Sequence, residues 1–122
     1  MHEVVWQEGN SIEIIVWDEL TRKEFKEVLH QLESLCSGNR EINVMLDAGG
    51  LNKAEVSALK DEYDFYKKYQ NHLARVALVT DDRFKQFLAG IFAKFSDLDM
   101  RVFTNEQTDE AREWIFPSRL PG

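Results

Sequence analysis

Apolar and polar residues alternate in two short segments near the start of the chain. The segments are EVVWQE at 3–8 and SIEIIVW at 11–17, and a period of two is typical of β-strands. The dipeptide Gly9-Asn10 separates them, and glycine at the first position of a two-residue loop favours a tight hairpin turn. We therefore predict that these two strands pair as an antiparallel hairpin.

The predicted hairpin has apolar side chains on both faces. One face is expected to hold Val5, Ile12, Ile14 and Val16. The other face is expected to hold Val4, Trp6, Ile15 and Trp17. Because a sheet with two apolar faces must be covered on both, this pattern favours a layered arrangement with helices on each side.

The hydrophobic pattern changes to a helical period after the hairpin. Thr21 and Glu24 have the spacing of a capping box, in which each side chain bonds the backbone N–H of the other residue. The apolar positions that follow recur every three or four residues, at Phe25, Val28, Leu29, Leu32, Leu35 and Cys36. A helix is therefore predicted, and SGN at 37–39 is expected to end it.

Two further capping boxes predict two more helix starts. Asn52 with Glu55 predicts a helix from about 53 to 70, preceded by a turn at the glycines 49–50. Thr104 with Gln107 predicts the last helix, at 105–115.

Short apolar runs predict the remaining strands, at 41–47, 73–79 and 99–104, and an aromatic-rich helix lies between the last two, at 81–95. Alternating strands and helices imply parallel pairing with right-handed crossovers. We predict a single α/β domain over residues 1–122, with a mixed, mainly parallel five-stranded sheet, an N-terminal antiparallel hairpin and four helices.

Composition narrows the classes of partner. The chain of 122 residues is 43% hydrophobic and 30% charged, with a net charge of −7. That charge repels phosphate backbones and anionic lipids, so we expect no nucleic acid partner and at most weak membrane contact. The N-terminus lacks the basic start and apolar run of a signal peptide, and a cytoplasmic protein is expected. Cys36, on an apolar helix face, is expected to be buried and inert.

Three stretches carry a resemblance to a known family: VMLDAGGL at 44–51, LARVALVTDDRFKQFLAGIF at 73–92 and MRVFTNEQTDEAREWI at 100–115. They resemble the SpoIIAA-like family, a branch of the STAS superfamily that is distantly similar to CRAL-TRIO lipid-binding domains. The resemblance implies a STAS-like layered fold. Anti-sigma-factor antagonists of that superfamily carry a phosphorylatable Asp-Ser-Ser/Thr-Gly motif, whereas this chain has Asn52, Lys53 and Ala54 there. An antagonist role therefore rests on fold analogy alone.

Aromatic residues gather in the predicted second and third helices. The segment FKQFLAGIFAKF at 84–95 forms an apolar stripe of the width usual for a core-facing helix. The second helix adds an apolar stripe of its own and further rings near its opposite side, Phe65 and Tyr69. Because this exceeds what one sheet face needs, the rings are interpreted either as core or as a binding surface.

From this excess we predict a binding site for a small apolar ligand, as the likeness to CRAL-TRIO domains implies, or for a protein partner. The predicted site lies between the second and third helices and is formed by Leu59, Tyr63, Tyr66, Phe87, Ile91 and Phe95. The aromatic helices or an exposed first strand would also support a homodimer.

Acidic residues offer a rival site. Asp47, Asp81 and Asp82 follow predicted parallel strands, at the edge where α/β folds bind ligands. Three carboxylates there suit Mg²⁺ or a phosphoryl group. The alternative is that Asp81 or Asp82 caps the third helix and Asp47 simply ends its strand.

Sequence motifs give no positive sign of catalysis. The chain has no G-x-S-x-G, P-loop or G-x-G-x-x-G motif. Glu27 and His30 have the Glu-x-x-His spacing, but the second copy that a di-metal site needs is missing. His2 has no partner nearby in the sequence. We therefore expect a non-enzymatic binding module without a metal or cofactor.

Overall fold

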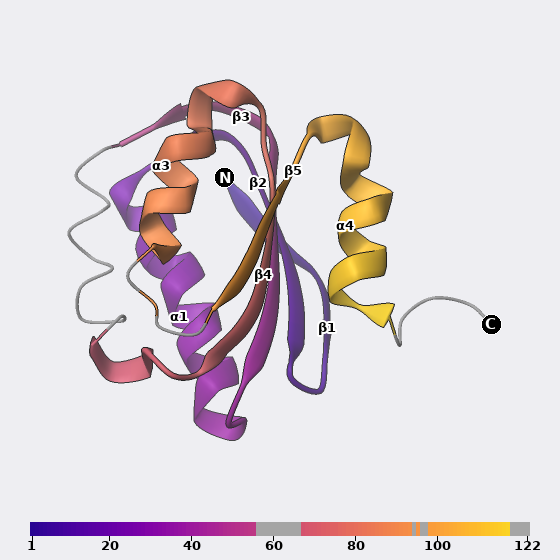
Figure 1. Ribbon diagram of the computed structural model, residues 1–122. Helices are drawn as coiled ribbons and strands as arrows, with labels where there is room; N and C mark the ends of the chain where they lie inside the picture. Colours follow the sequence, from indigo (N-terminus) through magenta and orange to yellow (C-terminus); the bar gives the residue numbers. More distant parts are fainter. Residues whose placement is uncertain (56–66, 94, 96–97, 118–122) are drawn as a thin grey trace.

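The computed structural model describes residues 1–55, 67–93, 95 and 98–117. Five strands form one sheet in the order β1-β2-β3-β4-β5 (Figure 1). They are β1 (His2–Glu8), β2 (Ser11–Leu20), β3 (Ile42–Ala54), β4 (Leu73–Val79) and β5 (Asp99–Phe103). β1 pairs with β2 in antiparallel fashion and every other pair is parallel, which confirms the predicted mixed sheet.

Helices cover both faces of the sheet, as predicted. They are α1 (Arg22–Gly38), α3 (Asp82–Phe92) and α4 (Thr108–Ile115), with a short 3₁₀ helix η2 (Asn105–Gln107) before the last. Because the strands follow one another in sequence order, right-handed crossovers place α1 and α3 on the same face. α4 follows the last strand and packs on the opposite face (Figure 1).

The predicted second helix is described only in part. Its residues 56–66 lie outside the described residues, and 67–69 are helical. Its predicted start is wrong, because 53 and 54 belong to β3.

Two predicted helix starts are confirmed by their hydrogen bonds. The Thr21 hydroxyl accepts from the backbone N–H of Glu24 at 3.1 Å, at the start of α1. Thr104 and Gln107 form the expected capping box, which begins η2 and leads into α4. These short polar side chains satisfy backbone donors that the first helical turn leaves without partners.

The sheet separates two apolar cores, since successive side chains of a strand point to opposite faces. In β3, Val44 and Leu46 face the larger core under α1 and α3. Met45 lies between them in sequence and faces the smaller core under α4. The alternation therefore sorts neighbouring residues into the two layers.

The hairpin is present, but its predicted faces are partly wrong. Gly9 adopts a φ of 58°, as the predicted turn requires. The register then shifts between Val4 and Trp6, so that Val4 pairs with Ile14. This bulge turns Val4 toward the larger core and leaves Val5 exposed, the reverse of the prediction.

The third strand is longer than predicted, and the turn and cap assigned to its end are wrong. Gly50 and Asn52 lie inside β3, which continues to Ala54. β2 extends beside it, with Trp17 paired to Gly50 and Leu20 to Ala54. Glu55, the predicted capping partner, donates its backbone N–H to the Leu20 carbonyl at 3.0 Å. Pairing with β2 overrides the local preference of glycine and asparagine for turns.

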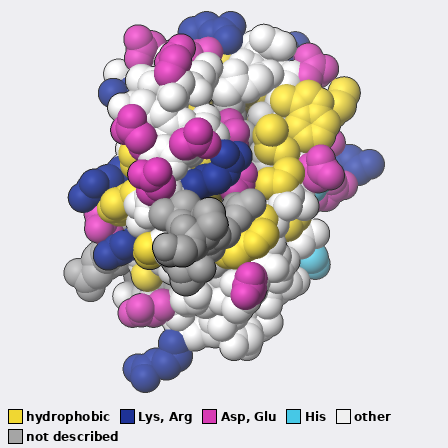
Figure 2. All heavy atoms as spheres, turned by 90° about the vertical axis from the view of Figure 1, so that its right-hand side faces the viewer, with side chains coloured by type: hydrophobic (Ala, Val, Ile, Leu, Met, Phe, Trp, Pro, Cys, Tyr) yellow, Lys and Arg dark blue, Asp and Glu magenta, His cyan; other side chains and the backbone are white. Residues whose placement is uncertain are grey.

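The face covered by α4 is only partly enclosed. Trp6, Phe103 and Trp114 pack at the edge of the smaller core and remain partly accessible. Figure 2 views this side and shows apolar side chains between acidic and basic ones. Within the described residues, no helix combines the length and apolar character needed to cross a membrane.

Candidate functional site

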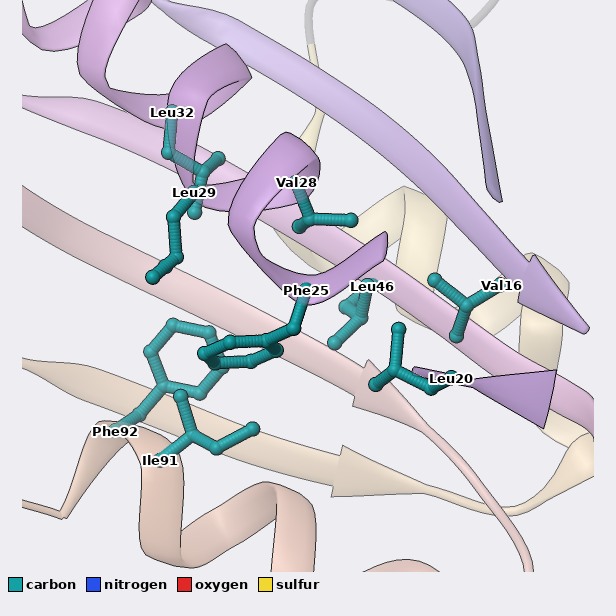
Figure 3. A pocket seen from close by; sticks show the side chains of 9 residues that line it. All are labelled: Val16, Leu20, Phe25, Val28, Leu29, Leu32, Leu46, Ile91 and Phe92. Carbon is teal, nitrogen blue, oxygen red and sulfur yellow. The ribbon is translucent and has the colours of Figure 1, made fainter. Parts of the chain in front are cut away.

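An apolar cavity lies between α1, α3 and the sheet. It has a volume of about 20 Å³. Figure 3 shows the described side chains around it: Val16, Leu20, Phe25, Val28, Leu29, Leu32, Leu46, Ile91 and Phe92. All nine are hydrocarbon side chains. A water molecule in such a space would find few hydrogen-bond partners among them, so the cavity favours an apolar group.

Local patterning explains why these side chains converge. The inward stripe of α1 supplies four of them, because residues three and four apart share one side of a helix. Val16, Leu20 and Leu46 come from neighbouring strands on the same face of the sheet. Ile91 and Phe92 come from the last turn of α3. Four elements thus form the walls.

The predicted ligand-binding residues divide between described and undescribed parts of the chain. Ile91 lines the cavity and is 3% exposed. Phe95 is buried next to Phe92, with ring centroids 6.1 Å apart, and Phe87 is partly buried against the same core. The other three, Leu59, Tyr63 and Tyr66, lie outside the described residues.

The stripe at 84–95 faces the core, which confirms the simpler of its two interpretations. Four of its apolar residues are buried: Leu88, Ile91, Phe92 and Phe95. Phe84 and Phe87 pack against the same core and are partly buried. α3 itself ends at Phe92, three residues before its predicted end.

One wall of the cavity was not predicted as a site. The sequence indicated that α1 is a core helix, and its Phe25, Val28 and Leu29 are indeed buried. A packed helix and a cavity wall have the same apolar spacing. Only the three-dimensional arrangement distinguishes a helix that lines a cavity from one that is fully packed.

The three acidic residues of the rival site have separate local roles. Asp47 accepts a hydrogen bond from the Gly49 N–H at 3.0 Å. Asp81 caps α3 by accepting from the Arg83 N–H at 2.9 Å, as the alternative interpretation predicted. Hydrogen bonds from the Arg83 side chain hold the pKa of Asp81 below its ordinary value. Asp82 is exposed in the first turn of α3.

Among the described residues, these three carboxylates do not form a group close enough to share one metal ion. The described group with such spacing is instead His2, Glu24 and Glu27. The His2 Nδ1 contacts the Glu24 carboxylate, and this hydrogen bond lowers the pKa of Glu24. Sequence reasoning missed this pair, because its members lie on different elements.

Cys36 is buried in α1, as predicted. Burial raises the pKa of its thiol to about 11. The thiol is therefore protonated at neutral pH, which agrees with the expected lack of reactivity.

The chain is similar to known proteins in both sequence and structure. A family model described as SpoIIAA-like matches residues 11–116. No curated protein matches the chain. An uncharacterized protein with a SpoIIAA-like fold from Shewanella loihica PV-4 is similar in structure, with 18% identity and a TM-score of 0.68. The match covers 94% of this chain and 92% of that one.

Two structures of SpoIIAA are also similar. The unphosphorylated anti-sigma factor antagonist SpoIIAA matches with 10% identity and a TM-score of 0.59, over 94% of this chain and 98% of that one. The phosphorylated Bacillus cell fate determinant SpoIIAA matches with 8% identity and a TM-score of 0.53, over 90% and 97%. The TM-scores show a shared fold, which confirms the predicted architecture, and at these low identities the matches show the fold alone.

Proposed function

The chain belongs to the SpoIIAA-like family, and we propose that it is a non-catalytic module that binds a small apolar ligand between α1, α3 and the sheet. The observation that carries this proposal is the cavity, around which nine hydrocarbon side chains from four elements converge. The predicted ligand class is unchanged. The site now has α1 as one wall, whereas the sequence suggested the second helix.

The chemistry of the lining supports an apolar ligand over a polar one. A polar ligand buried against these nine side chains would lose its hydrogen bonds to water without regaining them from the described lining. An acyl chain has no such penalty and gains about 0.8 kcal/mol for each methylene group it buries. A fatty acid is the simplest ligand of this kind.

The size of the cavity requires the walls to move. A volume of about 20 Å³ accommodates about one water-sized group. A longer chain would enter only if α1 and α3 moved apart or if their side chains changed rotamer. The proposed binding of an acyl chain therefore includes a movement of α1 relative to α3.

Native mass spectrometry of the protein purified from cells tests the proposal. We expect an additional mass that corresponds to a fatty acid or similar apolar molecule and that disappears after denaturation. The stripped protein should then bind a fluorescent fatty acid in a saturable manner. No co-purifying molecule and no saturable binding would contradict the proposed function.

A matched pair of substitutions tests the location. Val28→Phe should fill the cavity and weaken fatty acid binding by about tenfold or more, equivalent to about 1.4 kcal/mol. Val5→Phe makes the same change at an exposed position on β1 and should leave affinity unchanged. Thermal unfolding of both variants verifies that they are folded. Equal affinities for the two folded variants would place the site elsewhere.

A further inference from the structure

Three metal-binding side chains meet where the first strand passes the start of the first helix. They are His2 on β1 and Glu24 and Glu27 on α1, and one ligand atom from each lies within 4.8 Å of the others. The side chains of His2 and Glu24 are 16% and 27% exposed, and that of Glu27 is 48% exposed. The group is therefore open to solvent on one side and walled by protein on the other.

The fold holds the three side chains in place. His2 pairs with Val16 in the hairpin, which fixes the start of β1 beside α1. Glu24 and Glu27 are three residues apart and so project from one side of the helix. The hydroxyl of Thr21 caps the helix by accepting from the Glu24 N–H. The Glu24 carboxylate meanwhile contacts His2.

We propose that His2, Glu24 and Glu27 form a binding site for a divalent transition-metal ion such as Zn²⁺. An ion held about 2.0–2.1 Å from each tetrahedral ligand would separate the ligand atoms by about 3.3 Å. The His2 Nδ1 and Glu27 Oε2 atoms are 3.8 Å apart. Small side-chain rotations that separate His2 from Glu24 and bring Glu27 closer would place the three ligands around an ion, with a water molecule as the fourth.

The charge and the type of the ligand atoms determine which metal ion the site prefers and how tightly it binds. Two carboxylates balance the charge of a divalent cation, and a neutral imidazole favours Zn²⁺ over Mg²⁺, which prefers oxygen ligands. The Met1 ammonium opposes binding, since it lies 4.0 Å from Glu24 Oε2. It is held there by hydrogen bonds to the Trp17 and Glu19 carbonyls. The site should therefore bind less tightly than a closed structural zinc site.

Isothermal titration of the full chain, purified without a polyhistidine tag, tests the site. We expect one Zn²⁺ per chain and no detectable Mg²⁺ binding. His2→Ala and the double variant Glu24→Gln with Glu27→Gln should each weaken Zn²⁺ binding by about tenfold or more. His30→Ala removes an exposed histidine one turn farther along α1 and should bind Zn²⁺ like the unmodified protein.

Two results would overturn the proposal. One is the absence of Zn²⁺ binding by the unmodified protein. The other is equal Zn²⁺ affinity in all variants, which would indicate adventitious binding elsewhere on the surface. Circular dichroism of each variant shows whether it is still folded. A folded His2→Ala variant that no longer binds Zn²⁺ supports the proposed site.

Discussion

At the scale of single residues, a buried carboxylate carries a large desolvation cost that other groups must offset. The Glu13 side chain on β2 is 3% exposed. Arg112 of α4 donates two hydrogen bonds to it, from Nε at 3.1 Å and from Nη2 at 3.0 Å. These bonds raise the pKa of Arg112. The pair ties α4 to the sheet and compensates the cost of burying a charge.

Loss of Arg112 should therefore destabilise the protein. Arg112→Leu removes both charged hydrogen bonds from a buried carboxylate, and we expect the free energy of unfolding in urea to fall by about 3 kcal/mol. Adding Glu13→Leu in the same chain should recover most of this loss, because the leucine would pack within the apolar layer under α4. A single variant as stable as the unmodified protein would contradict the structural role of the pair.

Three helix caps were predictable because their hydrogen bonds are local in sequence. Thr21, Asp81 and Thr104 cap the helices at which the sequence placed them. The spacing of a few residues decides such hydrogen bonds. The Glu13–Arg112 and His2–Glu24 contacts span 99 and 22 residues. They depend on which strands and helices become neighbours, which no local spacing reveals.

At the scale of elements, the pairing of β2 with β3 determines where β3 ends, which the local sequence pattern predicted wrongly. Two register shifts allow the strands to continue side by side, between Ile15 and Trp17 and between Asp18 and Glu19. Asp18 has a φ of 61° next to the second shift, an uncommon conformation for a residue other than glycine. The extended pair converts a predicted turn and helix start into strand.

Gly50 is required by this close pairing. A Cβ atom at Gly50 would lie 3.2 Å from the Trp17 Cβ, which its own backbone holds in place. Gly50→Ala should therefore lower the free energy of unfolding by about 1–3 kcal/mol. Gly38→Ala is the control, since a Cβ there meets nothing within 4 Å. That change should be neutral or stabilise by about 0.4–1 kcal/mol.

Urea unfolding of the two alanine variants compares these outcomes directly. If Gly50→Ala were as stable as Gly38→Ala, the contact between Gly50 and Trp17 would not limit the packing of β2 against β3.

At the scale of the whole molecule, the alternation of strands and helices predicted the architecture correctly. Strand order and crossover handedness follow from general rules, so α1 and α3 had to share a face once the sheet was parallel. The candidate site was harder to predict. Ile91 lines the cavity, but the α1 wall depends on how two core-facing helices meet over the sheet.

The apolar cavity and the His2 group adjoin through α1 but differ in chemistry. Phe25 and Val28 line the cavity, and the residues that precede them, Glu24 and Glu27, belong to the His2 group. One side of the helix faces hydrocarbon and the other faces His2 and solvent. We therefore expect a substitution in the cavity to leave Zn²⁺ binding unchanged, and a substitution in the His2 group to leave fatty acid binding unchanged.

The most direct test of apolar ligand binding is methyl NMR during titration of the stripped protein with a fatty acid. Leu46 and Met45 are neighbours on β3 that face opposite sides of the sheet. We predict saturable shifts of the Leu46 and Ile91 methyl signals, with little change at Met45. Shifts confined to Met45 and the α4 side, or no saturable shift, would contradict the proposed site.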